Sequence, residues 1–257
     1  MSAVLAGLFF ATALLYASVG FGGGSTYNAL LVLNGTDYRV LPAIALICNM
    51  IVVSGGVWRF ARAGYVSLQR LAPFLVASVP AAWIGGRIPI SETLFVSLLG
   101  LSLLAAGTRL LFEQEPQSAP DGVARSYHWG AAAAVGGAIG LLAGLVGIGG
   151  GIFLAPVLYF WRWGTPRQIA GAASVFILVN SAAGLAGQAA KLNELSLLPA
   201  LSEYWPLFPA VLIGGQIGSY LGSERISPVW VKRLTAALIL YVAVRLLYRW
   251  AGMMGWF

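Results

Sequence analysis

The sequence predicts an all-α polytopic bundle of transmembrane helices, and three observations lead to this fold class. First, 59% of the 257 residues are hydrophobic and 9% are charged, which leaves too few charges to coat a soluble domain of this size. Second, long uncharged runs recur along the chain, and roughly 20 apolar residues are enough to cross the hydrocarbon core. Third, almost no sequence remains between these runs for a soluble domain.

Uncharged runs mark the segments expected inside the bilayer, because an ionised side chain at bilayer depth costs about 3 kcal/mol. The runs lie at 1–36, 40–58, 71–86, 93–108, 126–161, 168–190, 204–223 and 234–244. Tryptophans near the ends of these runs are expected at the membrane interface, where their rings set the depth of a segment. They are Trp58, Trp83, Trp129, Trp161, Trp163, Trp205, Trp230 and Trp250. We therefore expect a multi-pass protein surrounded by membrane lipids.

A polar segment at 113–128 divides the chain near its middle. It contains Glu113, Glu115, Asp121 and Arg125 together with two prolines, a composition typical of a connection between two membrane blocks. We expect a first membrane repeat at 1–112 and a second at 129–257. No cleavable signal peptide is expected, since no Lys or Arg precedes the first apolar segment and that segment continues into more apolar sequence.

The two halves of the chain repeat each other. Gly22-Gly23-Gly24 recurs as Gly149-Gly150-Gly151 at an offset of 127, and Asn49 recurs as Asn180 at an offset of 131. Arg109-Leu110-Leu111-Phe112 is matched by Arg245-Leu246-Leu247-Tyr248 at an offset of 136. The order is kept and the offset only grows, as small loop insertions in the second half would produce, whereas chance matches would scatter in both directions.

Each half opens with a 36-residue uncharged run that a glycine triplet interrupts. As one helix such a run would be about 54 Å long, against a hydrocarbon core of about 30 Å. Three consecutive glycines favour an unwound backbone, so each run is expected to form a helix, a loop and a short second helix, at 25–33 or 152–160. These short helices cannot span, and each run is expected to turn back.

The fifteen basic residues indicate how the segments cross. If each 36-residue run returns to its starting side and the other three segments of each half cross, the split is ten to five. One side receives Arg59, Arg62, Arg70, Arg109, Arg125, Arg162, Arg167, Arg225, Lys232 and Arg233, and the other receives Arg39, Arg87, Lys191, Arg245 and Arg249. The positive-inside rule places the larger set in the cytoplasm. Each half then crosses an odd number of times, which predicts inverted repeats.

Composition argues against several other classes of protein. The net charge of +7 is spread as single basic residues at segment ends, which favours lipid headgroups over nucleic acid. One cysteine, Cys48, and one histidine, His128, provide neither a disulfide nor a metal-ligand cluster. We expect no enzyme, no catalytic residue, no metal and no cofactor. No Asp or Glu lies deep in a run, so a proton relay through a buried carboxylate is not expected either.

Inverted repeats with broken helices are typical of secondary transporters, whose sites lie between the repeats near the midplane. There the start of a short helix offers free N–H groups and a positive dipole end to an anion. The expected substrate-binding residues are Gly22, Gly23, Gly24, Ser25, Asn28, Asn49, Gly149, Gly150, Gly151, Ser174, Asn180, Ser181, Gln188 and Arg87. Polar side chains among them can donate hydrogen bonds to an oxyanion. The alternatives are interhelical hydrogen bonds and, for Arg87, a snorkelling interfacial position.

A third set of glycines favours packing over binding. Gly136, Gly140 and Gly144 recur every four residues, so they lie on one face of a helix, where small residues let two helices approach closely. A nucleotide-binding loop is not expected at either glycine triplet, because neither is followed by the Lys-Ser/Thr pair of a P-loop.

The glycine motifs also resemble those of a known family over nearly the whole chain. The segments 20–24 and 144–151, with Pro156 five residues on, are similar to the paired glycine signatures of the TauE/SafE sulfite exporter family. The segment 170–174 with Asn180-Ser181 resembles the second-half pattern of that family, and 62–66 resembles its loop glycine. The first half departs from two-fold symmetry in having Ala43 where the repeat would place a partner for Ser174.

This resemblance implies a transporter of a small sulfur-containing anion in the bacterial inner membrane. The expected substrate is sulfite or a related organosulfonate such as sulfoacetate. An inside-negative potential favours outward movement of an anion by about 2.3 kcal/mol per charge per 100 mV, so a sulfite uniporter would need no second ion. A passive anion channel is the alternative, because half-helix N-termini serve channels equally well. The sequence makes no prediction of the oligomeric state.

Overall fold

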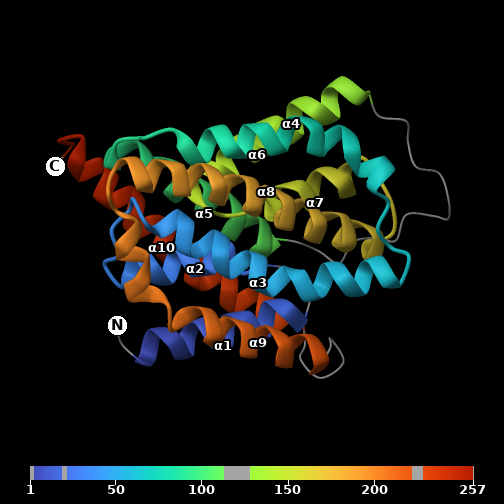
Figure 1. Cartoon of the computed structure of the whole chain (residues 1–257), viewed down its shortest axis with the longest axis horizontal. Coiled ribbons are helices and arrows are strands. Elements are labelled where there is room, and N and C mark those ends of the chain that lie inside the picture. The colour runs from blue at the N-terminus through green and yellow to red at the C-terminus, as the bar shows by residue number, and fades with distance from the viewer. Residues whose placement is uncertain (1–2, 19–21, 113–127, 222–227, 257) are drawn as a thin grey trace.

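A computed structural model of the chain describes residues 3–18, 22–112, 128–221 and 228–256, and everything described is helix, turn or loop (Figure 1). The first half contains α1 (Ala3–Ser18), α2 (Gly24–Leu33), α3 (Leu41–Arg62), α4 (Leu68–Arg87) and α5 (Glu92–Phe112). The second half contains α6 (Trp129–Val146), α7 (Gly151–Phe160), α8 (Pro166–Glu194), a 3-10 helix at Leu198–Tyr204, α9 (Leu207–Leu221) and α10 (Pro228–Met253). The all-helical prediction is confirmed for the described residues. The polar connection predicted at 113–128 lies outside them except for His128.

Five of the described helices are long and apolar enough to cross a membrane: α3, α5, α6, α8 and the Ala236–Met253 part of α10. The multi-pass prediction is therefore confirmed. Two of the expected crossings, α4 and α9, do not meet this standard. α9 has 15 residues, and α4 carries Arg70, Arg87 and two internal prolines within its 20 residues, which lowers its apolar content.

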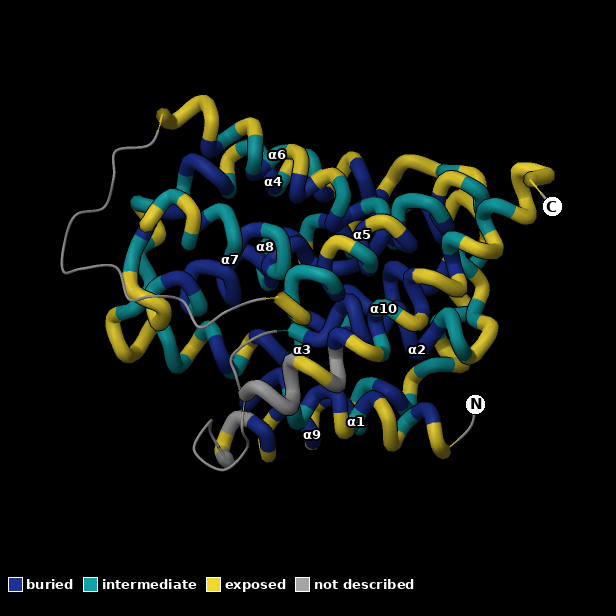
Figure 2. Tube along the Cα trace, turned by 180° about the vertical axis from the view of Figure 1, so that it is seen from behind, coloured by how far each residue is buried: buried dark blue, intermediate teal, exposed yellow. Residues whose placement is uncertain are grey.

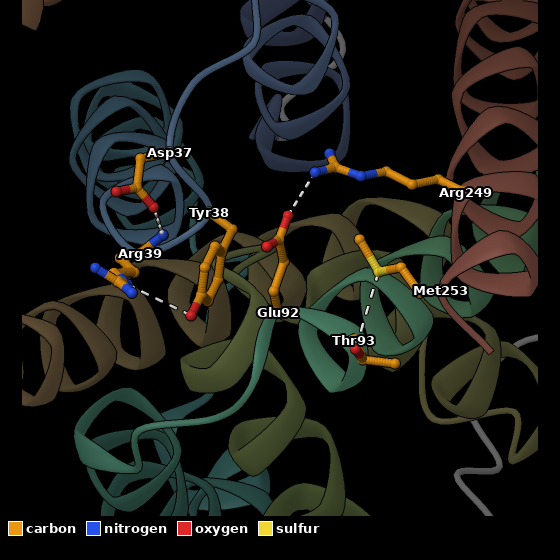
Figure 3. Close-up of polar contacts among 7 residues, drawn as sticks. All are labelled: Asp37, Tyr38, Arg39, Glu92, Thr93, Arg249 and Met253. Carbon is orange, nitrogen blue, oxygen red and sulfur yellow. Dashed lines mark hydrogen bonds and ion pairs between the residues drawn. The ribbon is translucent and has the colours of Figure 1, made fainter. Parts of the chain in front are cut away.

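Contacts gather the loop at 34–40, the start of α5 after the loop at 88–91, and the loop at 195–206 at one end of the bundle, which we call end A. Figure 3 shows Tyr38 and Arg39 of the first of these loops near Glu92 of α5. Arg249 near the end of α10 forms an ion pair with Glu92 at the start of α5. Tyr204 donates a hydrogen bond to Thr36 Oγ1 across 3.5 Å. Both termini of the described chain lie toward this end in Figure 1.

The loops at 63–67 and 161–165 meet at the opposite end, which we call end B. Arg70, in the first turn of α4, donates a hydrogen bond to the carbonyl oxygen of Trp163. Arg167 Nη1, in the first turn of α8, donates to Tyr65 Oη across 3.0 Å. These contacts join the two halves of the chain at end B.

Two helix pairs form the outer layers, and glycines let each pair pack tightly (Figure 1). A Cβ at Gly136, Gly140 or Gly144 of α6 would lie 2.0–2.3 Å from a carbonyl oxygen of α4, so the predicted packing stripe is confirmed. A Cβ at Gly214 or Gly218 of α9 would lie as close to a carbonyl of α1, at 2.4 and 2.0 Å. In both pairs, successive glycines along one helix face successively later residues of the other helix. α6 therefore runs parallel to α4, and α1 runs parallel to α9.

These pairings fix the course of the two long uncharged runs. α9 follows the end A loop at 195–206, so its parallel partner α1 also begins at end A, and α2 ends there at 34–40. α4 follows the end B loop at 63–67, so α6 begins at end B, and α7 ends there at 161–165. In this arrangement each run returns to the end at which it began, and α1 and α6 run in opposite directions.

The buried interior lies between the outer layers, where α3 packs against α8. Figure 2 shows the buried residues of these middle helices in dark blue. Trp163 departs from its expected interfacial position, since its side chain is 1% exposed and packs in the hydrophobic core at end B. The guanidinium of Arg70 covers its ring at 4.2 Å. The sequence pattern failed here because a tryptophan at a run boundary can face the protein as readily as the lipid. Trp58, Trp129 and Trp205 are exposed.

Candidate functional site

The glycine triplets interrupt their runs as predicted, but with different backbone conformations. α1 ends at Ser18 and α2 begins at Gly24, and the residue before α2, Gly23, has an ordinary φ of −94°. Between α6 and α7, Gly147, Gly149 and Gly150 have φ values of +78°, +80° and +82°. Only glycine adopts this left-handed region readily. The second break therefore needs glycine for its backbone shape, whereas the first needs it for another reason.

That reason is close approach, because the two breaks meet in the buried interior. A Cβ at Gly24 would lie 2.6 Å from the carbonyl oxygen of Ile148 and 2.4 Å from Asn49 Nδ2. A Cβ at Gly22 would lie 2.6 Å from Asn49 Oδ1. No side chain fits at those distances, so Gly22 and Gly24 allow the first break to touch the second break and α3.

The second break contacts the same asparagine and one residue of α8. A Cβ at Gly149 would lie 2.9 Å from Asn49 Nδ2 and 3.1 Å from Ser181 Oγ. Asn49 and Ser181 have no exposed surface. The site therefore consists of two broken helices held against the crossing of α3 and α8, with Asn49 touching both breaks.

The starts of α2 and α7 bring backbone N–H groups to this junction. The first helical hydrogen bond of α2 runs from the Tyr27 N–H to the Gly23 carbonyl, and that of α7 runs from the residues after Ile152 to the Gly150 carbonyl. The N–H groups that precede those bonds have no intrahelical partner. Together with the helix dipole, such groups favour a negatively charged ligand.

Three side-chain amides cap the carbonyl end of α6. Asn28 Nδ2 donates to the Val146 carbonyl across 2.9 Å, Asn49 Nδ2 to the Ile148 carbonyl across 3.2 Å, and Gln188 Nε2 to the Gly144 carbonyl across 2.8 Å. These are the interhelical hydrogen bonds that the sequence left open as the alternative. They connect α2 and α3 in the first half to the second break.

Other predicted site residues lie near the junction but bond within their own helix. Asn180 Nδ2 donates to the Phe176 carbonyl across 2.8 Å, and Ser174 Oγ donates to the Ala170 carbonyl across 2.8 Å. Ser25 is buried in the first turn of α2. Asn49 and Asn180, which the sequence aligns with each other, thus have different partners, since Asn49 reaches across to a break and Asn180 bonds within α8.

Three of the predicted site residues do not face the junction. A Cβ at Gly23 would face Thr12 and Tyr27, and one at Gly150 would face Ile139 and Phe176. Arg87 lies at end A, where its half-exposed side chain forms an ion pair of 2.9 Å with Glu194 and stacks over Trp83. Its position matches the interfacial alternative.

Sequence reasoning missed a buried lysine at the end of α8 that lies toward end A. Lys191, in the last turn of α8, is 8% exposed, and no acidic partner is seen for it among the described residues. It follows Gln188 by three residues, so the two side chains lie on the same helix face. Its spacing from a buried glutamine was the signal available in the sequence, where it was counted only as a basic residue at a segment end.

Carboxylates and metal ligands do not contribute to the described part of the site. The acidic residues that the structure describes lie at end A, on or beside the loops that define that end, and none of them is buried; they are Asp37, Glu92, Glu194 and Glu203. No group of three His, Cys, Asp or Glu side chains that could hold a metal ion occurs among the described residues.

Five of the described helices are apolar and long enough to cross a membrane, and two broken helices meet in the buried interior. Together these features define a multi-pass membrane protein of the transporter class. The family model described as "Sulfite exporter TauE/SafE" matches residues 4–246. A protein of Sinorhizobium fredii named "Probable membrane transporter protein y4hK" is 34% identical over 245 residues, which cover 95% of this chain and 97% of that protein. No solved structure matches the chain. The chain belongs to the TauE/SafE sulfite exporter family, whose members are transporters and not enzymes.

Proposed function

We propose that this protein exports a small sulfur oxyanion, sulfite or a related organosulfonate such as sulfoacetate, across the bacterial inner membrane. The anion binds where the starts of α2 and α7 meet, between the two halves of the chain. One observation carries this proposal: Gly22 and Gly24 let the first break approach both Asn49 and the Ile148 carbonyl within the buried interior. Membership of the sulfite exporter family supports the choice of substrate.

The halves of the chain are proposed to be inverted repeats. Their helices follow the same order of long, short and three long elements, and α1 and α6 start at opposite ends. Equivalent helices also have equivalent partners, since α1 packs on α9 as α6 packs on α4, and α3 and α8 pack on each other. Sites at the interface of such repeats are typical of alternating-access carriers.

The orientation follows from charge. End B carries Arg59, Arg62, Arg70, Arg162 and Arg167, which belong to the larger basic set, so end B is proposed to face the cytoplasm. An inside-negative potential then drives the bound anion from end B to end A at about 2.3 kcal/mol per charge per 100 mV.

Flux through reconstituted protein tests the proposal. Purified full-length protein in liposomes is expected to move radiolabelled sulfite with saturable kinetics and to support counterflow, with sulfate and taurine as competitors that measure selectivity. Sulfite flux equal to that of empty liposomes, from protein shown to be folded, would contradict the proposed substrate. Fast, non-saturating flux without counterflow would instead favour the passive anion channel, which uses the same helix N-termini.

A further inference from the structure

Pro156 removes one hydrogen bond from the first turns of α7. In an α-helix each carbonyl accepts from the N–H group four residues further on. The residue four positions after Ile152 is Pro156, and proline has no N–H group. The Ile152 carbonyl therefore lacks its usual partner within the helix. A carbonyl left in this way inside a protein needs a donor from elsewhere.

Arg109 supplies that donor from the other half of the chain. Its Nη1 donates to the Ile152 carbonyl oxygen across 3.1 Å. Arg109 lies in the last turn of α5, and because α5 begins at end A, this turn lies toward end B. The proline thus frees the carbonyl that the arginine binds. The sequence marks Pro156 only as part of a family motif, and the bond to Arg109 gives the proline a physical role.

This bond fixes a positive charge beside the start of α7. A guanidinium is always charged in proteins and has several N–H donors, and a neutral carbonyl occupies one of them without cancelling the charge. The N–H group of Ile152 is itself among those with no intrahelical partner. A cation is disfavoured beside a helix N-terminus, where the dipole is already positive, and an anion between the two relieves that repulsion. Arg109 and the start of α7 therefore favour the same kind of ligand.

An unpaired hydroxyl at the same break points independently to a ligand. Ser181 Oγ on α8 lies 3.1 Å from the position of a Cβ at Gly149, in the break that precedes α7. Ser181 is fully buried, and its hydroxyl has no hydrogen-bond partner. Buried polar groups are nearly always paired, and a hydroxyl can donate to an oxyanion. The break before α7 thus contains a buried donor that a ligand can use.

The place of Arg109 in the membrane adds to the argument. α5 is one of the five described helices that are long and apolar enough to cross a membrane, and Arg109 is half-buried on it. Ionisable side chains within such helices are costly and usually mark the path of a substrate. Arg62 at end B is exposed by contrast and stacks over Trp58, as an interfacial arginine does.

We propose that Arg109, held on the Ile152 carbonyl that Pro156 frees, binds the anion as it reaches the start of α7 from end B. This inference rests on the proposed function. It adds a charged ligand to a site otherwise built from backbone N–H groups and neutral side chains. A planar guanidinium can bond two oxygens of an oxyanion at once, so Arg109 also favours an oxyanion as the substrate.

Variants of Arg109 separate anion binding from support of α7. Arg109→Met removes the charge and the donors, so KM for sulfite in proteoliposomes is expected to rise about tenfold or more. Arg109→Lys keeps the charge and is expected to stay within about threefold of the native KM. If Arg109 only supports α7, Arg109→Met would lower the melting temperature and leave KM unchanged, which would overturn the proposal.

Arg62→Met is the matched control, because it removes an exposed charge at the same end of the bundle. It is expected to leave KM for sulfite unchanged. A rise in KM equal to that of Arg109→Met would overturn the proposal, because general attraction by charges at end B would then be sufficient.

Melting temperatures measured without any anion test the bond between Arg109 and Ile152 by itself. Arg109→Met is expected to lower the melting temperature by several degrees, because it leaves the Ile152 carbonyl unpaired. In Pro156→Ala the helix can bond this carbonyl itself, so the same substitution is expected to have a much smaller effect there. Pro80→Ala, which replaces an exposed proline inside α4, is the control in which Arg109→Met keeps its full effect. An equal effect in all three backgrounds would overturn the role of Pro156.

Sulfite flux through the native protein separates this inference from the proposed function. Folded native protein that moves no sulfite would contradict the proposed substrate, whereas the melting temperatures would still test the pairing of Arg109 with Pro156. Native flux together with an unchanged KM in Arg109→Met would overturn this inference alone and leave the proposed function standing.

Discussion

The two short helices occupy equivalent places in the two halves, but they bring different chemistry to the junction. α2 begins Gly-Ser-Thr-Tyr-Asn and is buried from Gly24 to Leu31. α7 begins Gly-Ile-Phe-Leu-Ala, and of its ten residues only Gly151, Leu154, Ala155 and Leu158 are buried. The start of α2 therefore offers hydroxyl and amide side chains, whereas the start of α7 offers only backbone groups. Similar backbone courses can thus bring different side chains to one junction.

Substitution of the two repeat-related asparagines is expected to give the largest difference between the halves. Asn49→Leu removes the bond to the Ile148 carbonyl and the contacts with both breaks. A buried acceptor left unpaired costs about 1–3 kcal/mol, and sulfite flux is expected to be lost. Asn180→Leu removes a bond within α8 only and is expected to retain more flux. Proteoliposome flux and unfolding in detergent measure both; equal losses would show that the halves contribute alike.

Glycine substitution is expected to separate the two breaks by backbone strain. Gly150→Ala places a side chain at φ +82° and brings a Cβ to 2.8 Å from Ile139. Gly23→Ala has φ −94° and meets only the side chains of Thr12 and Tyr27, at 2.9 Å. The left-handed conformation adds about 1–2 kcal/mol, so Gly150→Ala is expected to be the less stable variant by that amount. Similar unfolding free energies in detergent would contradict this reading of the second break.

A hydroxyl deletion sharpens the contrast between the short helices. Ser25→Ala removes a buried donor from the first turn of α2, and a typical hydrogen bond contributes about 1 kcal/mol, so KM for sulfite is expected to rise about fivefold. Ile152→Ala changes the equivalent position of α7, which has no donor to lose, and is expected to leave KM within twofold. Initial rates of sulfite flux over a range of concentrations measure both. An equal rise in KM would indicate that the side chain of Ser25 does not contact the anion.

Two basic residues of end A are expected to give the smallest effects, and they differ by burial. Lys191→Gln removes a charge that is 8% exposed and is expected to raise KM for sulfite about threefold, with Lys191→Arg closer to normal. Arg87→Gln breaks an exposed pair with Glu194, which contributes about 0–1 kcal/mol, and is expected to leave KM unchanged. The flux of each variant is also measured over a range of salt concentrations, since salt screens the charge of an exposed residue. A larger rise in KM for Arg87→Gln than for Lys191→Gln would indicate that the anion passes along the exposed surface of end A.

The fold could be predicted largely because lipid imposes strong rules on composition. Uncharged runs located α3, α5 and α8, and the length of the glycine-interrupted runs required them to turn back, as α2 and α7 do. α4 and α9 lie where crossings were expected but are more polar or shorter than a span. Glycine-mediated contacts pack α4 against α6 and α9 against α1. Such contacts depend on tertiary structure that no single segment encodes.

The burial of the candidate site residues could be predicted from the sequence, but their hydrogen bonds could not. The buried positions of Asn28, Asn49, Asn180 and Gln188 followed from polar residues within apolar runs, and all four are buried. Which group each amide faces depends on the approach of distant helices, as in the bond from Asn49 to Ile148, 99 residues along the chain. Lys191 escaped notice for the same reason, because burial at the end of a helix depends on its neighbours.

The caps on α6 constrain how the protein can move. The bonds from Asn28 to Val146 and from Asn49 to Ile148 each join one half of the chain to the other. If the halves rock against each other to expose the junction first to one side of the membrane and then to the other, both bonds must stretch, break or follow the motion. Together the two bonds would resist this motion, and the rate at which they break would limit how often the junction can change the side of the membrane to which it is exposed.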